Sequence, residues 1–75
     1  MGRLGGHKPD AVIAAFRRFG WEIRRQTGGH VIMRKEGNPN VLSIPYHKGR
    51  DLKEGLLRSQ LQAAGIDVDS FLAVV

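Results

Sequence analysis

The residues that most clearly suggest chemistry are a histidine and the two glycines directly before it, Gly28, Gly29 and His30. Glycine permits backbone conformations with positive φ and lets a phosphate approach closely, and histidine is the side chain that titrates nearest neutrality. A run of strand-forming residues follows, so the pattern predicts an imidazole at the beginning of a strand, over an anion site. The same residues also fit a hairpin turn followed by an ordinary surface histidine, and the pattern leaves both interpretations open.

Cleavage of RNA is a reaction for which one such group is sufficient. RNA carries its own nucleophile, the 2′-hydroxyl, so a cleaving site needs a general acid or base and cations against the phosphate, with no metal required. His30 is the candidate acid or base. The candidate phosphate-binding cations are Arg25, Lys48, Arg50 and Lys53, and for each of them a solvated surface charge is the alternative.

Two further histidines lie outside this motif. His47 follows a Pro-Tyr pair in a predicted loop and is a candidate second polar group at the site, although a loop histidine more often has a structural or surface role. His7 is assigned no role. Three histidines so far apart, in a chain without cysteine, lack the close spacing of zinc ligands, so the sequence predicts neither a metal nor another cofactor.

The composition indicates one small basic domain. Twelve lysines and arginines against seven acidic residues give a formal charge of +5 on 75 residues, which attracts polyanions and above all nucleic acid. No cysteine, membrane span or signal peptide is recognisable, so we expect a cytoplasmic protein that does not contact a membrane. We expect residues 1–7 to form a flexible tail and residues 8–75 a single domain with a short C-terminal helix.

The elements that position these residues follow from the spacing of apolar side chains. Apolar residues on one face predict a first helix over residues 9–19, with Gly20 as its left-handed cap. The period then changes to two, which predicts strands over residues 21–26, 30–35 and 41–44, joined by glycine-rich and proline-containing turns. Three short strands joined in this way form an antiparallel meander.

The first strand is expected to be half buried. Trp21 and Ile23 form its apolar side, and Glu22, Arg24 and Gln26 lie on the polar side. Because Trp21 alternates in phase with Ile23, it is expected in the core and not on an RNA-stacking surface.

Two helices are predicted after the strands. The segment from Asp51 to Glu54 has the spacing of a capping box, so Asp51 is expected to cap a second helix that ends at Gly65. Asp67 is expected to cap a last, short helix. The order α-β-β-β-α predicts an α+β domain in which a three-stranded antiparallel sheet carries its helices on one face.

Taken in order, these residues resemble the HicA-type mRNA interferase toxins. The resemblance runs from about residue 8 to residue 66 and rests on Phe19-Gly20-Trp21, Arg25-Gln26-Thr27-Gly28-Gly29-His30, Ile44-Pro45-Tyr46-His47, Leu52-Lys53-Glu54-Gly55-Leu56-Leu57-Arg58 and Ala64-Gly65-Ile66. It implies a double-stranded-RNA-binding-like fold, cleavage of mRNA, and neutralisation by a HicB-type antitoxin encoded beside the toxin.

The resemblance also implies roles for single residues. The catalytic histidine of the family lies in a Gly-Ser-His motif, and the matching position here is His30. This sequence has Gly29 where serine is usual and Thr27 where lysine is common, so Arg25 and the backbone amides of the two glycines would partly replace the lost hydroxyl and charge in binding the phosphate. Leu56 stands where threonine is common, which we interpret as a change in packing. Two alternatives stay open: a non-catalytic RNA-binding module of the same fold, and a domain that binds only an acidic protein.

Overall fold

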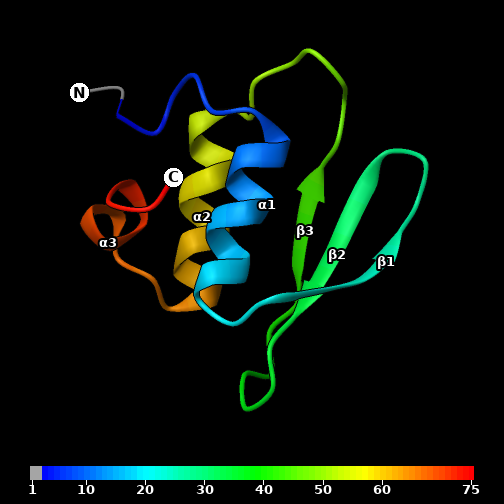
Figure 1. Ribbon diagram of the computed structural model, residues 1–75, viewed down its shortest axis with the longest axis vertical. Coiled ribbons are helices and arrows are strands. Elements are labelled where there is room, and N and C mark those ends of the chain that lie inside the picture. Colours follow the sequence, from blue (N-terminus) through cyan, green and yellow to red (C-terminus); the bar gives the residue numbers. More distant parts are fainter. Residues whose placement is uncertain (1–2) are drawn as a thin grey trace.

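The computed structural model describes residues 3–75, whose elements follow the predicted order. The strands form one antiparallel sheet in the order β1-β2-β3, and α1 and α2 lie next to each other on one side of it, with α3 beyond them (Figure 1). The predicted α+β fold is confirmed. The elements are α1 (Pro9–Arg18), β1 (Glu22–Gln26), β2 (His30–Arg34), β3 (Leu42–Pro45), α2 (Glu54–Ala64) and α3 (Val68–Leu72).

The core lies between the helices and one face of the sheet. Side chains alternate between the two faces of a strand, so Val31 and Met33 of β2 face the helices and are buried, whereas His30 and Arg34 lie on the other, open face and are exposed. The predicted strand mouth therefore presents His30 to solvent. The largest fully buried side chains are Trp21, Phe16, Phe71, Leu4, Met33, Leu42, Ile44, Leu57, Leu61, Val12 and Val31.

The prediction of a half-buried first strand is wrong. Trp21 is buried as predicted, but it precedes β1, and every residue of β1 is exposed, including Ile23 at 43%. The reason is the place of β1 in the sheet. It is an edge strand, whereas both helices that cover the sheet pack against β3 at the other edge.

A β-bulge in β1 also changes which residues share a face. The register shifts between Ile23 and Arg25, so that Arg25 pairs with Ile32 and Gln26 pairs with Val31. Gln26 therefore lies on the helix side, not on the polar side as predicted. Arg25 lies on the open face, because Ile32 points away from the core.

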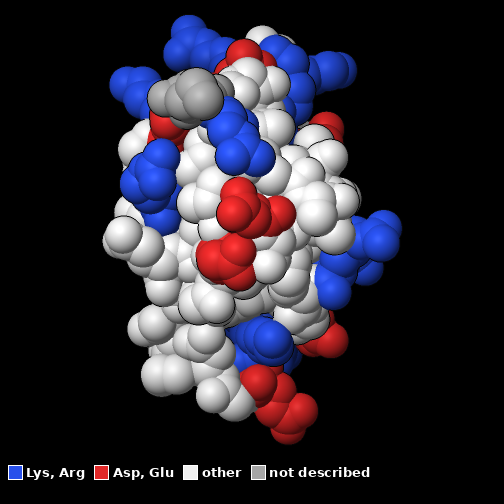
Figure 2. Space-filling view, turned by 90° about the vertical axis from the view of Figure 1, so that its left-hand side faces the viewer, with Lys and Arg blue, Asp and Glu red and all other residues white. Residues whose placement is uncertain are grey.

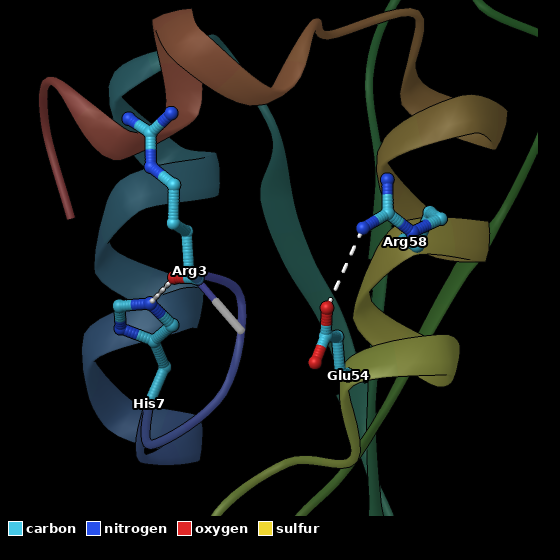
Figure 3. A network of polar contacts seen from close by, with 4 residues as sticks. All are labelled: Arg3, His7, Glu54 and Arg58. Carbon is cyan, nitrogen blue, oxygen red and sulfur yellow. Dashed lines mark hydrogen bonds and ion pairs between the residues drawn. The ribbon is translucent and has the colours of Figure 1, made fainter. Parts of the chain in front are cut away.

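Residues 3–7, called here the N-terminal segment, are packed onto the domain, which differs from the flexible tail expected for residues 1–7. Leu4 is only 1% exposed and belongs to the core, and the backbone N–H of Leu52 donates to the carbonyl of His7 at 2.9 Å. Figure 3 shows the ring of His7 turned back to the carbonyl of Arg3, at 3.0 Å. The segment thus fastens the connection before α2; Met1 and Gly2 lie outside the described residues.

The prediction that Asp51 caps the second helix is wrong. The backbone is still extended at Lys53, so α2 begins at Glu54 with Lys53 as its N-cap and without a side-chain cap. Asp51 instead forms an ion pair with Lys8, whose Nζ lies 2.6 Å from Oδ1. On its surface, α2 carries an ion pair between Glu54 and Arg58 at 3.5 Å (Figure 3).

The other predicted helix ends are confirmed. Gly20 and Gly65 adopt the left-handed conformation, with φ of 95° and 73°. Asp67 caps α3, since its carboxylate accepts the backbone N–H of Ser70 at 3.0 Å and the hydroxyl of Ser70 at 2.7 Å. Within residues 3–75, no helix is long and apolar enough to cross a membrane.

Candidate functional site

The turn between β1 and β2 is short, and its two central residues, Gly28 and Gly29, have no side chains. The backbone N–H of Thr27 donates to the carbonyl of His30 at 2.9 Å, and the N–H of His30 donates to Oγ1 of Thr27 at 3.1 Å. Neither Gly28 nor Gly29 has a positive φ, so the expected need for a left-handed glycine is absent here. A Cβ added to Gly28 would meet nothing within 4 Å. The two glycines therefore leave the turn open to approach and are not required by its backbone conformation.

His30 is the first residue of β2 and lies on the open face of the sheet. It is exposed, and among residues 3–75 its ring nitrogens have no hydrogen-bond partner. Its partner across the sheet is Pro45, the last residue of β3. The backbone of His30 is thus fixed by the sheet, while the ring nitrogens can still form a hydrogen bond with a bound molecule. A group that exchanges protons with a ligand needs such a free nitrogen.

Arg25 reaches the same face because of the β-bulge. It pairs with Ile32, two residues after His30 on β2, so Arg25 and His30 are diagonal neighbours on the open face. Such neighbours have Cα atoms about 7–8 Å apart, which is within reach of an arginine side chain. An anion above this end of the sheet can contact both side chains.

His47 lies against the turn. Its Cε1 is 3.9 Å from the position that a Cβ on Gly29 would occupy. The backbone N–H of Tyr46 donates to the carbonyl of Gly29 at 2.9 Å, which extends the pairing of β2 and β3 by one step. The connection between β3 and α2 therefore passes directly beside the turn before His30, and it brings the second candidate histidine to the candidate site.

A hollow of about 330 Å³, called here the loop hollow, opens beside this connection. Pro45 is one of its walls, so it adjoins His30 across the sheet. Lys48 lines a smaller neighbouring hollow of about 240 Å³ together with Lys8 and Tyr46. The loop hollow is lined by Pro9, Pro45, His47, Arg50, Asp51, Leu52, Lys53 and Leu56.

The predicted site residues thus form two adjoining groups. His30 and Arg25 lie on the open face, next to Gly28 and Gly29. The second group lies along the connection between β3 and α2 and consists of His47, Lys48, Arg50 and Lys53. Neither His30 nor Arg25 lines the loop hollow or its smaller neighbour, but Pro45 lines the loop hollow beside the second group and is paired with His30 of the first. A chain-like ligand can contact both groups at once.

A comparison with known families agrees with this arrangement. A family model described as the HicA toxin of bacterial toxin–antitoxin systems matches residues 10–66. The chain belongs to the HicA toxin family. The matched region contains the whole sheet, the turn, both groups of site residues and α2, so the resemblance seen in the sequence is confirmed, and the protein is the toxin of a toxin–antitoxin pair. No curated protein matches the chain.

Positive charge gathers at the end of the toxin that carries the site. Figure 2 shows lysine and arginine side chains concentrated at the upper end, where Figure 1 places the loop between β3 and α2. The side chains of Lys48, Arg50 and Lys53 are exposed. Because a polyanion is attracted to such an end before any specific contact forms, the charge favours a polyanionic ligand. The described residues contain no group of three or more His, Cys, Asp or Glu side chains placed to hold a metal ion.

Two residues, Lys8 and Tyr46, make contacts that support the site and that sequence reasoning could not find. Lys8 bonds Asp51 and also donates to the carbonyl of Gly49 at 3.3 Å, so it fastens the loop that carries the cations. The hydroxyl of Tyr46 donates to Oδ1 of Asp10 at 2.6 Å, and this hydrogen bond raises the pKa of Tyr46. These contacts join the beginning of α1 to the connection between β3 and α2, at Tyr46, Gly49 and Asp51. No short motif signals contacts between residues so far apart along the chain.

Proposed function

We propose that this HicA toxin is an endoribonuclease that cleaves mRNA and uses His30 as its general acid or base. The observation that carries the proposal is the place of His30: an exposed imidazole at an open glycine turn, diagonal to Arg25 and paired with a wall of the cation-rimmed loop hollow. Membership of a toxin family adds that the reaction should harm a cell.

The chemistry needs two proton transfers at one phosphate. The 2′-hydroxyl of the RNA attacks the adjacent phosphorus, a new P–O2′ bond forms, and the P–O5′ bond breaks. His30 accepts the proton of the 2′-hydroxyl or supplies the proton that the departing 5′-oxygen needs. His47, which lies against Gly29, is the candidate for the second transfer, and water is the alternative.

The cations supply the remaining requirement. Negative charge accumulates on the phosphate oxygens as the new bond forms, and preorganised donors stabilise it. Arg25 lies beside His30, and Arg50 and Lys53 lie in the loop hollow. The first backbone N–H groups of α2 add further donors, because no side chain caps that helix. With the nucleophile supplied by the RNA and the charge met by these donors, the proposed mechanism requires no metal.

The partner that restrains the toxin is expected to be a HicB-type antitoxin that covers the same surface. Covering the groups that attract RNA is sufficient for inhibition, so the antitoxin should bury His30 and the segment from Lys48 to Lys53. A titration of preformed toxin–RNA complex with antitoxin tests this: RNA should be released. A stable ternary complex that retains RNA would show that inhibition works elsewhere.

The deciding experiment is incubation of the purified toxin with mRNA, with and without a chelator. Cleavage that the chelator does not affect is the expected result, together with arrest of growth when the toxin is expressed without antitoxin. Retention of RNA without cleavage would instead identify a binding module. If the toxin neither cleaves nor retains RNA, the remaining interpretation is a domain that binds only protein.

A further inference from the structure

The loop hollow has walls that a phosphate site does not need. Pro9 and Leu52 are buried, and Pro45 and Leu56 are half buried, so four of its eight lining residues form an apolar floor. A phosphate is bound by donors and cations, and an apolar floor contributes nothing to its binding. The floor therefore indicates that an uncharged, apolar part of the ligand enters the hollow.

The rim carries a different set of side chains. The other four lining residues are polar or charged and exposed, and they are called here the rim: His47, Arg50, Asp51 and Lys53. An imidazole and a guanidinium are flat groups on which unstacked RNA bases commonly stack. The charge of Asp51 is met by Lys8 at 2.6 Å, so Arg50 and Lys53 leave the rim positive.

We propose that the loop hollow binds one nucleobase of the RNA, next to the phosphate at which His30 acts. This inference rests on the proposed function and names the part of the substrate that positions the phosphate. A ligand with a flat apolar ring joined to a negative backbone matches an apolar floor inside a positive rim. The volume of about 330 Å³ lies at the lower end of the range of small-molecule sites, roughly 300–1,000 Å³.

The place of the hollow fits this role. Pro45 forms its wall and is directly opposite His30, and side chains of such cross-strand pairs have Cβ atoms about 4.5–5.5 Å apart. A base held against Pro45 thus keeps its own backbone beside the imidazole. Because a base can enter the hollow only after it leaves its stacked neighbours, the site selects single-stranded RNA.

An acidic segment of a protein is a poorer occupant. Its carboxylates would pair with the rim, but the prolines and leucines of the floor offer them no donor in place of the water that they would lose. An apolar side chain of the antitoxin is the stronger competitor, and the test below separates it from the base.

The experiment uses the toxin with His30→Ala, so that RNA is bound without being cut. Equilibrium binding is measured for a set of short single-stranded RNAs, each lacking the base at one position. Removing the base at one position should lower the affinity roughly 5–150-fold, since a stacked base contributes about 1–3 kcal/mol. Removing the base at any other position should lower the affinity much less. Adding Leu56→Trp should fill the hollow and abolish this position-specific loss.

Leu72→Trp is the matched control, because Leu72 is also half buried but lies on α3, outside the loop hollow. It should leave the position-specific loss unchanged. Arg50→Ala, which keeps the apolar floor intact, should reduce that loss and provides a variant that does not disturb packing. Melting temperatures show whether each variant folds.

Three outcomes separate the two proposals. Equal affinity for every base-deleted RNA would overturn the base-binding hollow, while cleavage by the parent toxin would still support the nuclease. A position-specific loss combined with no cleavage by the parent would support the hollow and overturn the nuclease. If Leu56→Trp weakens antitoxin binding and leaves the position-specific loss intact, the hollow receives a protein side chain and the inference is wrong.

Discussion

The two ends of the sheet both carry a basic hollow, yet only one has the parts of a catalytic site. The near end holds His30, Pro45 and the loop hollow. The far end holds a hollow of about 650 Å³, called here the far hollow, which is the larger of the two. The far hollow is lined by Gly20, Glu22, Arg24, Arg34, Lys35, Glu36, Gly37 and Asn38.

The difference lies in chemistry and not in size or in the number of cations. The far hollow has three cations, which we call the far-end cations (Arg24, Arg34 and Lys35), but two glutamates share it and it contains neither a histidine nor a large apolar side chain. The near end has the near-end cations (Lys48, Arg50 and Lys53), two histidines and an apolar floor. Positive charge can attract RNA to either end, but of the two hollows only the loop hollow is lined by a histidine, the side chain that titrates nearest neutrality.

The largest expected effect is on the rate of RNA cleavage, and it distinguishes two residues on the same face of β2. His30→Ala should lower the rate of RNA cleavage by about 10²–10⁴-fold, because it removes the general acid or base. Arg34→Ala, at the far end of β2, should leave the rate within a few-fold of the parent toxin. Single-turnover cleavage of a labelled RNA measures both. Equal rates for His30→Ala and the parent would remove His30 from the mechanism.

The next effect compares the two groups of cations at equal charge. Alanine at all three near-end cations should reduce the salt dependence of RNA binding, by about 0.7 in the log–log slope for each phosphate that the variant no longer neutralises. Alanine at the three far-end cations removes the same charge and should change the slope much less. Binding titrations between low and physiological salt measure both slopes. If the two variants behave alike, RNA is held by overall charge and not by the near end.

A third prediction concerns glycines at the two ends. Gly29→Ser should be tolerated, because φ there is not positive and the added Cβ would meet only Cε1 of His47, at an ordinary 3.9 Å. The new hydroxyl should strengthen RNA binding by roughly 2–10-fold, the value of one net hydrogen bond. Gly37→Ser should lower stability by about 1–2 kcal/mol, because Gly37 has a φ of 87°.

Thermal melts and RNA titrations of both variants test this difference. A large loss of stability in Gly29→Ser would mean that the near-end turn needs glycine for its conformation. In that case the glycines would be structural, as at the far end, and would not serve to keep the turn open.

The order and the approximate bounds of the helices and strands were predictable from the sequence, because they depend on local periodicity. The helices, the strands and the caps at Gly20, Gly65 and Asp67 all follow from residues within a few positions of each other. The β-bulge was not predictable, because an extra residue in β1 is defined only by its pairing with β2. Leu4 was missed because a single leucine among glycines has no periodic neighbours.

The candidate site shows the same division. His30 and its glycines form a local motif, so the sequence alone could locate them. The approach of His47 to Gly29 depends on the pairing of β2 with β3, and the floor of the loop hollow comes from α1, β3, α2 and the connection between them. The histidine was therefore predictable as a candidate, whereas the hollow beside it was not.

The smallest expected effect is at Asp51, the residue of the near end that the sequence identified as a helix cap. Its actual contact is the ion pair with Lys8, in which the side chains are 46% and 55% exposed. Exposed ion pairs of this kind contribute about 0.2–1 kcal/mol, so Asp51→Ala should hardly change the melting temperature. A clear destabilisation that Lys8→Met does not reproduce would mean that Asp51 stabilises α2 by itself.

Asp67, unlike Asp51, does cap a helix, so it serves as the comparison for Asp51. The hydrogen bonds from the hydroxyl and the backbone N–H of Ser70 lower the pKa of Asp67 in the folded toxin. A carboxyl group with a lowered folded pKa stabilises the fold above its unfolded pKa, about 3.9, and this stabilisation is lost as the pH falls through the folded value. Asp67→Ala should therefore lower the melting temperature at pH 7, and the difference from the parent should shrink as the pH falls below about 3.9. Asp51→Ala, melted over the same pH range, should show a smaller deficit at pH 7, because it loses an exposed ion pair and not a helix cap.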